Sequence, residues 1–459
     1  MSVRRSAGAI FWGLALVAIG GLLLANNLGY RIRIWPYVVR YWPALLIGWG
    51  LLKFIDFFRF RRSGDNRPLF SGGEVALLIL LIFAGSAITT AANVSPEIGN
   101  IFEIGDLDLW DITGDNYMYD QHLEQASVTP ASEIEIVNFY GNVEVRPADS
   151  DQIVVDVKKT VRAGSKDEAD RLERDFTFSI QPEGKKYRIA SNRDDGFTGP
   201  GVPRQRLKSS LTILVPKRSA VHLENRNGRI LLQDLTGNQN IVNRYGDVDV
   251  RNVEGELRLE NRNGSITAEE ITQAVSIENR YSNTTVKNVG GDLLIQTRNG
   301  SVDVSGVKGS VTVDNRYAPI SIENVEGQVT ITGRNNSVNV EHVEGDISAD
   351  SSYQNVTIKD PRGGVKITSR NGDLLLSFER VPQKDVQISS RYGNVTLELP
   401  SSSAFNIDAR TEYGEVDSDF EGLNTSRVNR QKSIGGQYGQ GGPHLEISTR
   451  NGNIRLDKK

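Results

Sequence analysis

The chain has 459 residues, which allows two or three domains. Its formal net charge of −4 gives no sign of general nucleic-acid binding, so no nucleic-acid partner is expected. Cysteine is absent, which excludes disulfides, thiol catalysis and zinc sites built on thiolates.

Three apolar stretches predict transmembrane α-helices at about residues 7–28, 42–58 and 75–92, within a membrane region of residues 1–93. The second stretch contains Lys53 and Asp56, so whether it fully spans the bilayer stays open. A cleavable signal peptide is the alternative for the first stretch, but two further apolar stretches follow it and disfavour cleavage.

The basic residues predict the orientation of these helices. Arg4 and Arg5 precede the first stretch and four arginines follow the second, whereas no Lys or Arg occurs from Pro68 to Val145. Positive charge marks the cytoplasmic side. We therefore expect a multi-pass protein of the cytoplasmic (inner) membrane, with the lipid bilayer as a partner, the N-terminus inside and the C-terminal domain extracytoplasmic. Residues 94–130 are acidic and are interpreted as a linker.

An 18-residue repeat organises the following region, with regular units from about residue 222 to 380. Asn-Arg-Asn-Gly and Asn-Arg-Tyr-Gly motifs place arginines at Arg226, Arg244, Arg262, Arg280, Arg298, Arg316 and Arg334. Ser352 takes the next place and Arg370 follows. The spacing then lengthens by three to Arg391, where residues 381–384 are expected to form a loop, and again to Glu412, before a last copy at Arg450.

Each unit contains two short strands. Val302 and Val304 alternate with polar residues, as do Val311 and Val313. One unit cannot bury its own valines, but units stacked about 4.8 Å apart can. The sequence therefore predicts an all-β domain at residues 131–459, a parallel β-solenoid (β-helix) of 18-residue coils, preceded by the three transmembrane α-helices. A β-propeller is the alternative, since a double unit of 36 residues approaches the length of a blade.

Two columns of side chains follow from the stacking. The residues before the arginines, Asn225, Asn243, Asn261, Asn279, Thr297 and Asn315, share the parity of the inward valines. They are predicted to form a buried column that satisfies corner backbone groups, with each amide bonding the next. The residues after the arginines alternate between asparagine and tyrosine, which makes the full period 36 residues.

The outward arginine column, together with Tyr245, Tyr281 and Tyr317, is the candidate binding surface. Arginines beside aromatic rings suit anionic or sugar-like polymers, so an envelope polysaccharide or a membrane protein is a possible partner. The alternative is a solvated salt-bridge ladder, because acidic residues lie two positions before several of these arginines, at Glu224, Glu260, Glu278 and Asp314.

The segments outside the regular repeat have their own signals. An early coil begins near Glu133, and a capping box at Ser165–Glu168 predicts a short helix to about Asp175. Strands are expected at residues 186–190 and 210–215, and loops at residues 195–208 and 434–443.

Residues 131–457 resemble the putative-adhesin family of bacterial β-strand-repeat proteins. The resemblance is carried by repeated units such as Asn263-Gly-Ser-Ile-Thr, by Leu214-Val-Pro216 and by the terminal Thr449-Arg-Asn-Gly-Asn-Ile-Arg-Leu456. The first 95 residues resemble a LiaF-like transmembrane region through Asn26-Asn-Leu-Gly29 and Trp42-Pro-Ala-Leu-Leu-Ile-Gly48. The resemblance implies a right-handed β-helix-like fold and a role at the cell envelope, in adhesion or in envelope stress, and it brings no catalytic residues.

We expect a binding, adhesin-like or scaffold module. The alternative is a regulatory membrane protein of an envelope-stress response that acts through its spans. A polysaccharide-active enzyme is a remote alternative, because acidic residues here repeat with the coil instead of clustering at one site. An irregular coil would mark such a site, and those at Ser352 and at residues 381–384 are the nearest candidates. The four histidines (His122, His222, His342 and His444) are scattered, so no cofactor or metal is expected.

Overall fold

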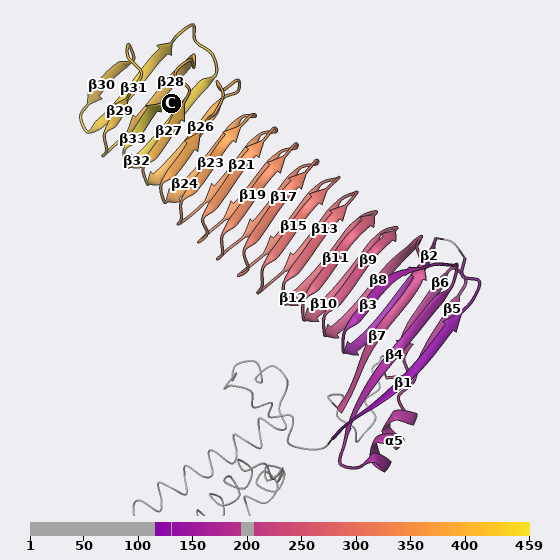
Figure 1. Ribbon diagram of the computed structural model, residues 1–459. Helices are drawn as coiled ribbons and strands as arrows, with labels where there is room; N and C mark the ends of the chain where they lie inside the picture. Colours follow the sequence, from indigo (N-terminus) through magenta and orange to yellow (C-terminus); the bar gives the residue numbers. More distant parts are fainter. Residues whose placement is uncertain (1–114, 130, 194–205) are drawn as a thin grey trace, which may run out of the picture. The chain divides into compact units, whose positions relative to one another are not determined.

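The computed structural model describes residues 115–129, 131–193 and 206–459. The chain divides into two compact units, Met1–Asn116 with Arg162–Ala169, and Tyr117–Val161 with Asp170–Lys459. The second unit is a rod of stacked coils (Figure 1). The three predicted membrane spans lie outside the described residues, within which no helix is long and apolar enough to cross a membrane.

Each coil of the rod contributes one strand to each of two parallel sheets, here named sheet A and sheet B. Partners in neighbouring strands are 18 residues apart, as in Val250↔Ala268 of sheet A and Ile241↔Leu259 of sheet B, except across the three-residue insertion, where they are 21 apart, as in Val365↔Val386. The predicted parallel β-solenoid of 18-residue coils is therefore confirmed. The regular strands of sheet A are β9 (Ile230–Thr236), β11 (Val248–Glu254), β13 (Ile266–Ile271), β15 (Thr284–Val289), β17 (Val302–Val307), β19 (Ile320–Val325), β21 (Val338–Val343), β23 (Val356–Pro361), β25 (Leu374–Ser377) and β27 (Val395–Leu399). Those of sheet B are β8 (Ser219–Asn227), β10 (Gln239–Tyr245), β12 (Leu257–Asn263), β14 (Val275–Asn279), β16 (Leu293–Thr297), β18 (Val311–Asn315), β20 (Val329–Gly333), β22 (Ile347–Ser351), β24 (Val365–Asn371) and β26 (Val386–Tyr392).

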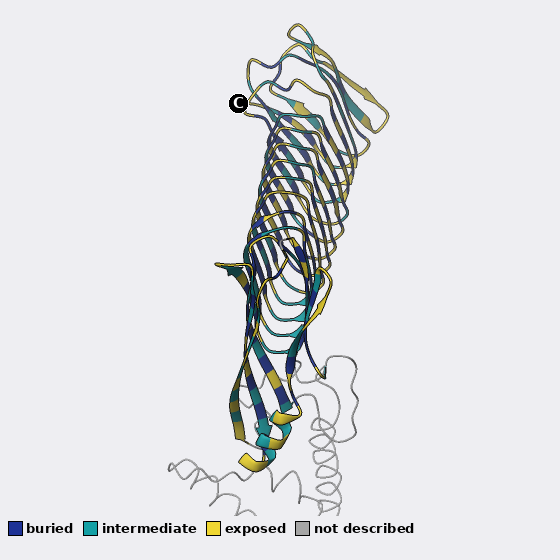
Figure 2. Cartoon of the chain, turned by 90° about the vertical axis from the view of Figure 1, so that its right-hand side faces the viewer, coloured by how far each residue is buried: buried dark blue, intermediate teal, exposed yellow. Residues whose placement is uncertain are grey.

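The core is the space between the two sheets, and Figure 2 shows the buried residues recurring at matching places in successive coils. Val302, Val304, Val311 and Val313 are all buried, while Asp303 and Thr312, which lie between the two members of each pair, face out. Stacked rows of β-branched side chains fill this interior, so each coil is stabilised by the coils on both sides.

A row of left-handed residues closes the strands of sheet A at one corner of the rod, which we call the left-handed column. It comprises Asp234, Asn252, Glu270, Asn288, Gly306, Asn324, His342 and Asp360, with φ between 43° and 71°. The column breaks the two-residue alternation, so that Val253 turns inward only three residues after Val250. Neighbouring members can also bond, since Asn252 Nδ2 donates to Asp234 Oδ1 at 2.7 Å. The 18-residue repeat and the two-residue alternation do not by themselves predict this column.

The N-terminal end of the rod is covered by additional strands. They are β1 (Asp115–Gln125), β2 (Ser132–Tyr140), β3 (Val143–Ala148), β4 (Ile153–Ala163), β5 (Phe178–Glu183), β6 (Lys186–Ser191) and β7 (Leu207–Pro216), with the helix α5 (Lys166–Arg174) between β4 and β5. The predicted helix, capping box and strands are present, and Glu168 N donates to Ser165 Oγ at 3.3 Å. The predicted linker was wrong for residues 115–125, which form β1 at the edge of sheet A, and the predicted loop at 195–208 ran too far, since β7 begins at Leu207.

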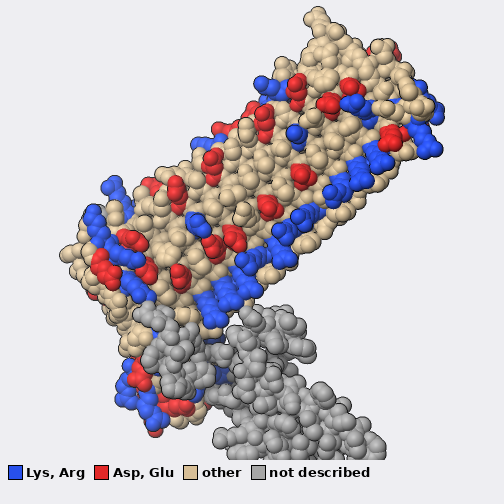
Figure 3. Space-filling model, turned by 180° about the vertical axis from the view of Figure 1, so that it is seen from behind, with Lys and Arg blue, Asp and Glu red and all other residues tan. Residues whose placement is uncertain are grey.

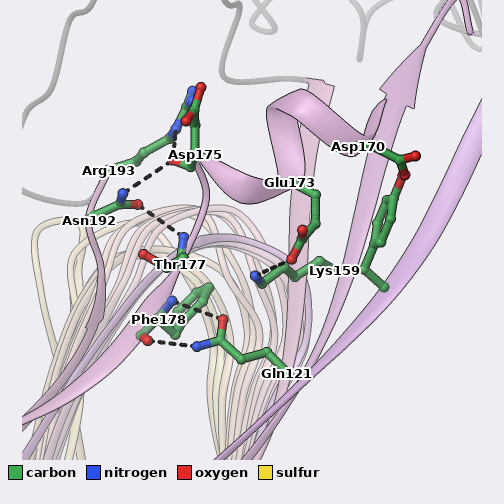
Figure 4. Close-up of polar contacts among 10 residues, drawn as sticks. Gln121, Lys159, Asp170, Glu173, Asp175, Thr177, Phe178, Asn192 and Arg193 are labelled. Atoms are coloured by element: carbon green, nitrogen blue, oxygen red, sulfur yellow. Dashed lines mark hydrogen bonds and ion pairs between the residues drawn. The ribbon is translucent and has the colours of Figure 1, made fainter. Parts of the chain in front are cut away.

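Polar side chains form hydrogen bonds inside this N-terminal cap (Figure 4). Lys159 is only 2% exposed, and its ammonium donates to Glu173 Oε1 at 2.9 Å. The side-chain amide of Gln121 takes the place of a neighbouring strand's backbone. Its Oε1 accepts from Phe178 N at 3.1 Å and its Nε2 donates to Phe178 O at 2.8 Å. Burial, reinforced by a hydrogen bond to Asp170, raises the pKa of Tyr119 to about 12.

The C-terminal end does not follow chain order. Its strands are β28 (Phe405–Thr411), β29 (Val416–Ser418), β30 (Asn424–Val428), β31 (Gln431–Tyr438), β32 (His444–Asn451) and β33 (Ile454–Lys458). Strand β32 inserts between β26 and β28. The position of Arg450 is thus stacked on that of Arg391, ahead of that of Glu412, which corrects the order predicted from the repeat. The loop predicted at residues 434–443 was wrong for residues 434–438, which belong to β31 and pair with β28.

Candidate binding face on sheet B

The outer face of sheet B rests on a buried column of asparagines at the ends of its strands. Asn225, Asn243, Asn261, Asn279 and Asn315 are all buried, as predicted. The predicted bond from one amide to the next was wrong for the regular coils, because each Nδ2 reaches backbone carbonyls instead. Asn261 Nδ2 donates to Gly246 O and to Gly264 O, both at 3.0 Å. From Asn225 to Asn279, each corner carbonyl between two successive asparagines therefore accepts hydrogen bonds from both of them.

From β20 onward the asparagine position holds other residues, namely Gly333, Ser351, Ser369, Ser390 and Thr449. Gly333 occupies the asparagine position, and Asn336 from three residues later fills the space. Asn336 is buried and donates from Nδ2 to Asn315 O at 3.0 Å. A Cβ at Gly333 would lie 2.2 Å from Asn336 Oδ1, so the glycine and the inserted amide require each other.

The arginine column lies on the solvent side of the asparagines. The register aligns Arg226, Arg244, Arg262, Arg280, Arg298, Arg316, Arg334, Arg370, Arg391 and Arg450, with Ser352 as the break between Arg334 and Arg370. Figure 3 shows a long row of basic side chains along one edge of the rod. At about 4.8 Å per coil, these eleven positions extend over about 48 Å. Arg280 and its successors are exposed, while Arg226, Arg244 and Arg262 are half-buried.

The acidic residues two positions before the arginines do not neutralise the column. Only Arg280 reaches such a residue, with Nη2 at 3.5 Å from Glu278 Oε1. Glu224 lies instead beside His222, and Glu260 accepts from Arg258 at 2.8 Å. That hydrogen bond raises the pKa of Arg258.

Arg450 also has a partner, with its Nε 3.3 Å from Glu412 Oε2, but most of the column has no carboxylate partner among the described residues. Within the described parts of the chain, Arg262, Arg298, Arg316 and Arg334 have no carboxylate oxygen within 4.0 Å. The alternative of a salt-bridge ladder therefore does not describe the column as a whole. Desolvation of these guanidinium groups by an anion would break no ion pair within the protein.

The tyrosines lie beside the arginines on the same edge. Tyr281 and Tyr317 are about half exposed, and Tyr245 is less so. The guanidinium of Arg244 lies 5.6 Å from the ring centre of Tyr245, and that of Arg391 lies 5.3 Å from Tyr392. Stacking of this kind restricts the orientation of the guanidinium.

Two shallow depressions lie over the N-terminal starts of the sheet B strands, at the end of each strand that is away from the arginine column. The first has a volume of about 610 Å³, covers the starts of β10, β12, β14, β16 and β18, and includes the exposed Leu294. The second, of about 310 Å³, covers the starts of β20, β22, β24 and β26 and includes Lys366. They follow each other along the rod, so the outer face of sheet B combines a longitudinal groove with a parallel basic edge. The groove could not be predicted from the sequence, because its depth depends on how the corners stack.

The charged groups of this face repeat from coil to coil, so the same contact can be made many times along the rod axis.

The family comparisons agree with the architecture. Residues 131–457 match the family described as Toastrack DUF4097, and residues 11–104 match the LiaF transmembrane domain. None of the curated proteins matches the chain.

Two solved structures cover most of the chain at low similarity. A "putative cell adhesion protein" from Clostridium sporogenes has 9% identity and a TM-score of 0.22, over 75% of this chain and 100% of that one. A "putative adhesin" from Bacteroides fragilis has 9% identity and a TM-score of 0.18, over 76% and 100%. Scores this low carry no argument, and the family assignment rests on the matched span alone. That span exceeds half of the chain, so the protein belongs to the Toastrack DUF4097 family and carries a LiaF transmembrane domain at its N-terminus.

Proposed function

We propose that this protein is a membrane-anchored, extracytoplasmic binding module that holds elongated anionic polymers of the cell envelope along the outer face of sheet B. The supporting observation is the arginine column, most of which has no carboxylate partner among the described residues. A row of cations about 4.8 Å apart on a rigid scaffold is pre-organised for a polyanion, since little side-chain or backbone order is lost on binding.

The proposed placement outside the membrane has its own support. Arginines cluster before the third predicted span, and Lys and Arg are absent from Pro68 to Val145. The LiaF transmembrane domain supplies the anchor. In this arrangement the rod displays its basic edge toward envelope polymers.

A binding role also agrees better with the chemistry of the face than an enzymatic one. Glycoside cleavage needs two carboxyl groups set about 5–10 Å apart across the scissile bond. Glu224 and Glu260 on this face are instead engaged by His222 and Arg258. We propose that this surface is not catalytic.

A regulatory role through the membrane region is the second candidate. It is favoured by the match of residues 11–104 to the LiaF transmembrane domain. In that case the rod would serve as a spacer or a docking element for a protein, and the arginine column would be dispensable for polymer binding.

Co-sedimentation separates the two candidates. The full chain in detergent would be mixed with isolated envelope polymers, with the Arg262→Gln/Arg298→Gln/Arg334→Gln variant beside it. A matched control removes three cations from sheet A that have ion pairs, through Arg251→Gln/Lys287→Gln/Lys359→Gln. We expect the first variant to lose most of its binding and the control to keep it. Equal binding by both variants, with intact folding, would reject the proposed face.

A further inference from the structure

Three metal-ligand side chains converge where the repeat becomes irregular. His342 lies on β21, Asp360 on β23, and Glu379 in the segment after β25 that leads into the three-residue insertion. One donor atom from each lies within 4.8 Å of the others. His342 and Asp360 are 18 residues apart, so the coil stacking makes them neighbours, whereas Glu379 comes from the coil that departs from the repeat.

The strongest indication of a ligand is an unsatisfied carboxylate oxygen. Asp360 is only 3% exposed, and its Oδ1 is buried with no hydrogen-bond partner. Its Oδ2 accepts from Arg362 Nη2 at 3.2 Å. A buried carboxylate oxygen without a donor is costly, and a bound cation would remove that cost.

Two other carboxylates in the left-handed column accept a hydrogen bond from a neighbouring coil and so need no cation. Asn252 donates to Asp234 at 2.7 Å, and Asn288 donates to Glu270 at 2.8 Å. In each case an amide N–H₂ group satisfies the carboxylate of the coil before it. At Asp360 the preceding coil offers the His342 imidazole, and the next offers the Glu379 carboxylate, which cannot donate when ionised.

We propose that His342, Asp360 and Glu379 bind a divalent metal ion of the zinc class, with one coordination position open. An imidazole nitrogen beside two carboxylates favours such an ion, whereas Ca²⁺ prefers six to eight oxygens. Donors at about 2.0–2.2 Å from a tetrahedral ion lie about 3.3–3.6 Å apart. Because the three donor atoms lie no more than 4.8 Å apart, they need to close by at most about 1.5 Å to reach these separations. Glu379 is exposed and is the side chain free to move.

The surroundings complete the site. Arg362 holds Asp360 through the oxygen opposite the orphaned one, as an outer-shell partner that orients a ligating carboxylate. The two carboxylates balance the charge of the ion. The ion would tie three consecutive coils together at the point where regular stacking is interrupted.

Zinc binding to the full chain, expressed without a histidine tag and held in detergent, tests this assignment. Competition with a chromogenic chelator should give one equivalent of Zn²⁺ per chain, and Zn²⁺ should raise the melting temperature. His342→Asn should weaken the affinity at least tenfold. Asparagine occupies the same column position at Asn324 with a similar φ, so this variant is expected to fold.

Two further variants make the result decisive. Glu379→Gln changes an exposed side chain and should also weaken binding at least tenfold. His222→Asn removes a histidine that lies 3.2 Å from Glu224, outside the proposed site, and should bind as the unaltered chain does. The proposal is overturned if the chain shows no saturable Zn²⁺ binding, if Ca²⁺ binds instead, or if His342→Asn and Glu379→Gln keep the original affinity.

Discussion

The sharing of corner carbonyls between successive asparagines leads to a specific double-mutant prediction. Gly264 O accepts from Asn261 Nδ2 at 3.0 Å and from Asn279 Nδ2 at 3.3 Å. Either single change to alanine leaves this carbonyl with one donor, whereas the double change leaves it with neither. Each single change should cost about 1–3 kcal/mol for the donated hydrogen bonds that are lost.

The double variant Asn261→Ala/Asn279→Ala should lose more free energy of unfolding than the two single variants lose together. The Gly264 carbonyl, left without a donor, adds about 1–3 kcal/mol of destabilisation, which appears as a coupling energy between the two substitutions. Asn243→Ala/Asn279→Ala is the matched control, because Asn243 donates to Gly228 and Gly246 and shares no carbonyl with Asn279. Its two effects should add to within about 0.5 kcal/mol.

Urea unfolding of the full chain in detergent, followed by the strand signal in far-ultraviolet circular dichroism, measures these energies. The described residues contain no tryptophan, so fluorescence would not report on the rod. Equal coupling in the two double variants would refute the shared-carbonyl reasoning. A single Asn261→Ala or Asn279→Ala variant with an unchanged free energy of unfolding would also refute it.

Other predictions address the corners and the N-terminal cap. Gly264→Ala should prevent regular stacking, because its Cβ would lie 2.0 Å from a carbonyl oxygen of the preceding coil, and loss of the cooperative thermal transition would show it. Glu173→Ala should destabilise the fold by about 3–5 kcal/mol by leaving the buried ammonium of Lys159 unpaired, while Lys159→Met in the same urea assay should be far milder. The hydrogen bond from Lys186 lowers the pKa of Glu135 below 4.5, so this pair stabilises the fold above that pH and the stabilisation is lost as the pH falls through the lowered value. Melting curves of the Glu135→Gln variant should accordingly approach those of the unaltered chain between pH 5 and pH 2.

Much of the rod was predictable because its interactions are local in the repeat. The 18-residue spacing fixed which residues stack, and two-residue alternation separated Val302 and Val304 from their exposed neighbours. The outward arginines and inward asparagines followed from the same parity. Parity could not predict the hydrogen-bond partner of each asparagine amide. The distance from Asn261 to the corner carbonyls depends on the path of the turn.

The ends of the rod and its irregular coil were harder to predict. Strand β32 enters between β26 and β28 because the chain loops back over the end, a long-range pairing that repeat spacing does not encode. Strand β1 was hidden in an acidic, weakly apolar segment that alternation did not mark. The cluster of His342, Asp360 and Glu379 was missed because scattered histidines argued against a metal site. The 18-residue interval between His342 and Asp360 was the available signal.

The most direct test of the proposed binding face is the salt dependence of polymer binding. The affinity of the full chain for a phosphate-containing envelope polymer would be measured at several salt concentrations, beside the Arg262→Gln/Arg298→Gln/Arg334→Gln variant. Each phosphate contact contributes about 0.7–0.9 to the slope of log affinity against log salt, by the behaviour of nucleic acids. If the arginine column binds the polymer, the slope falls by about 2–3 in the triple variant and is unchanged in the sheet A control. An equal slope in all three proteins would contradict the proposed binding face.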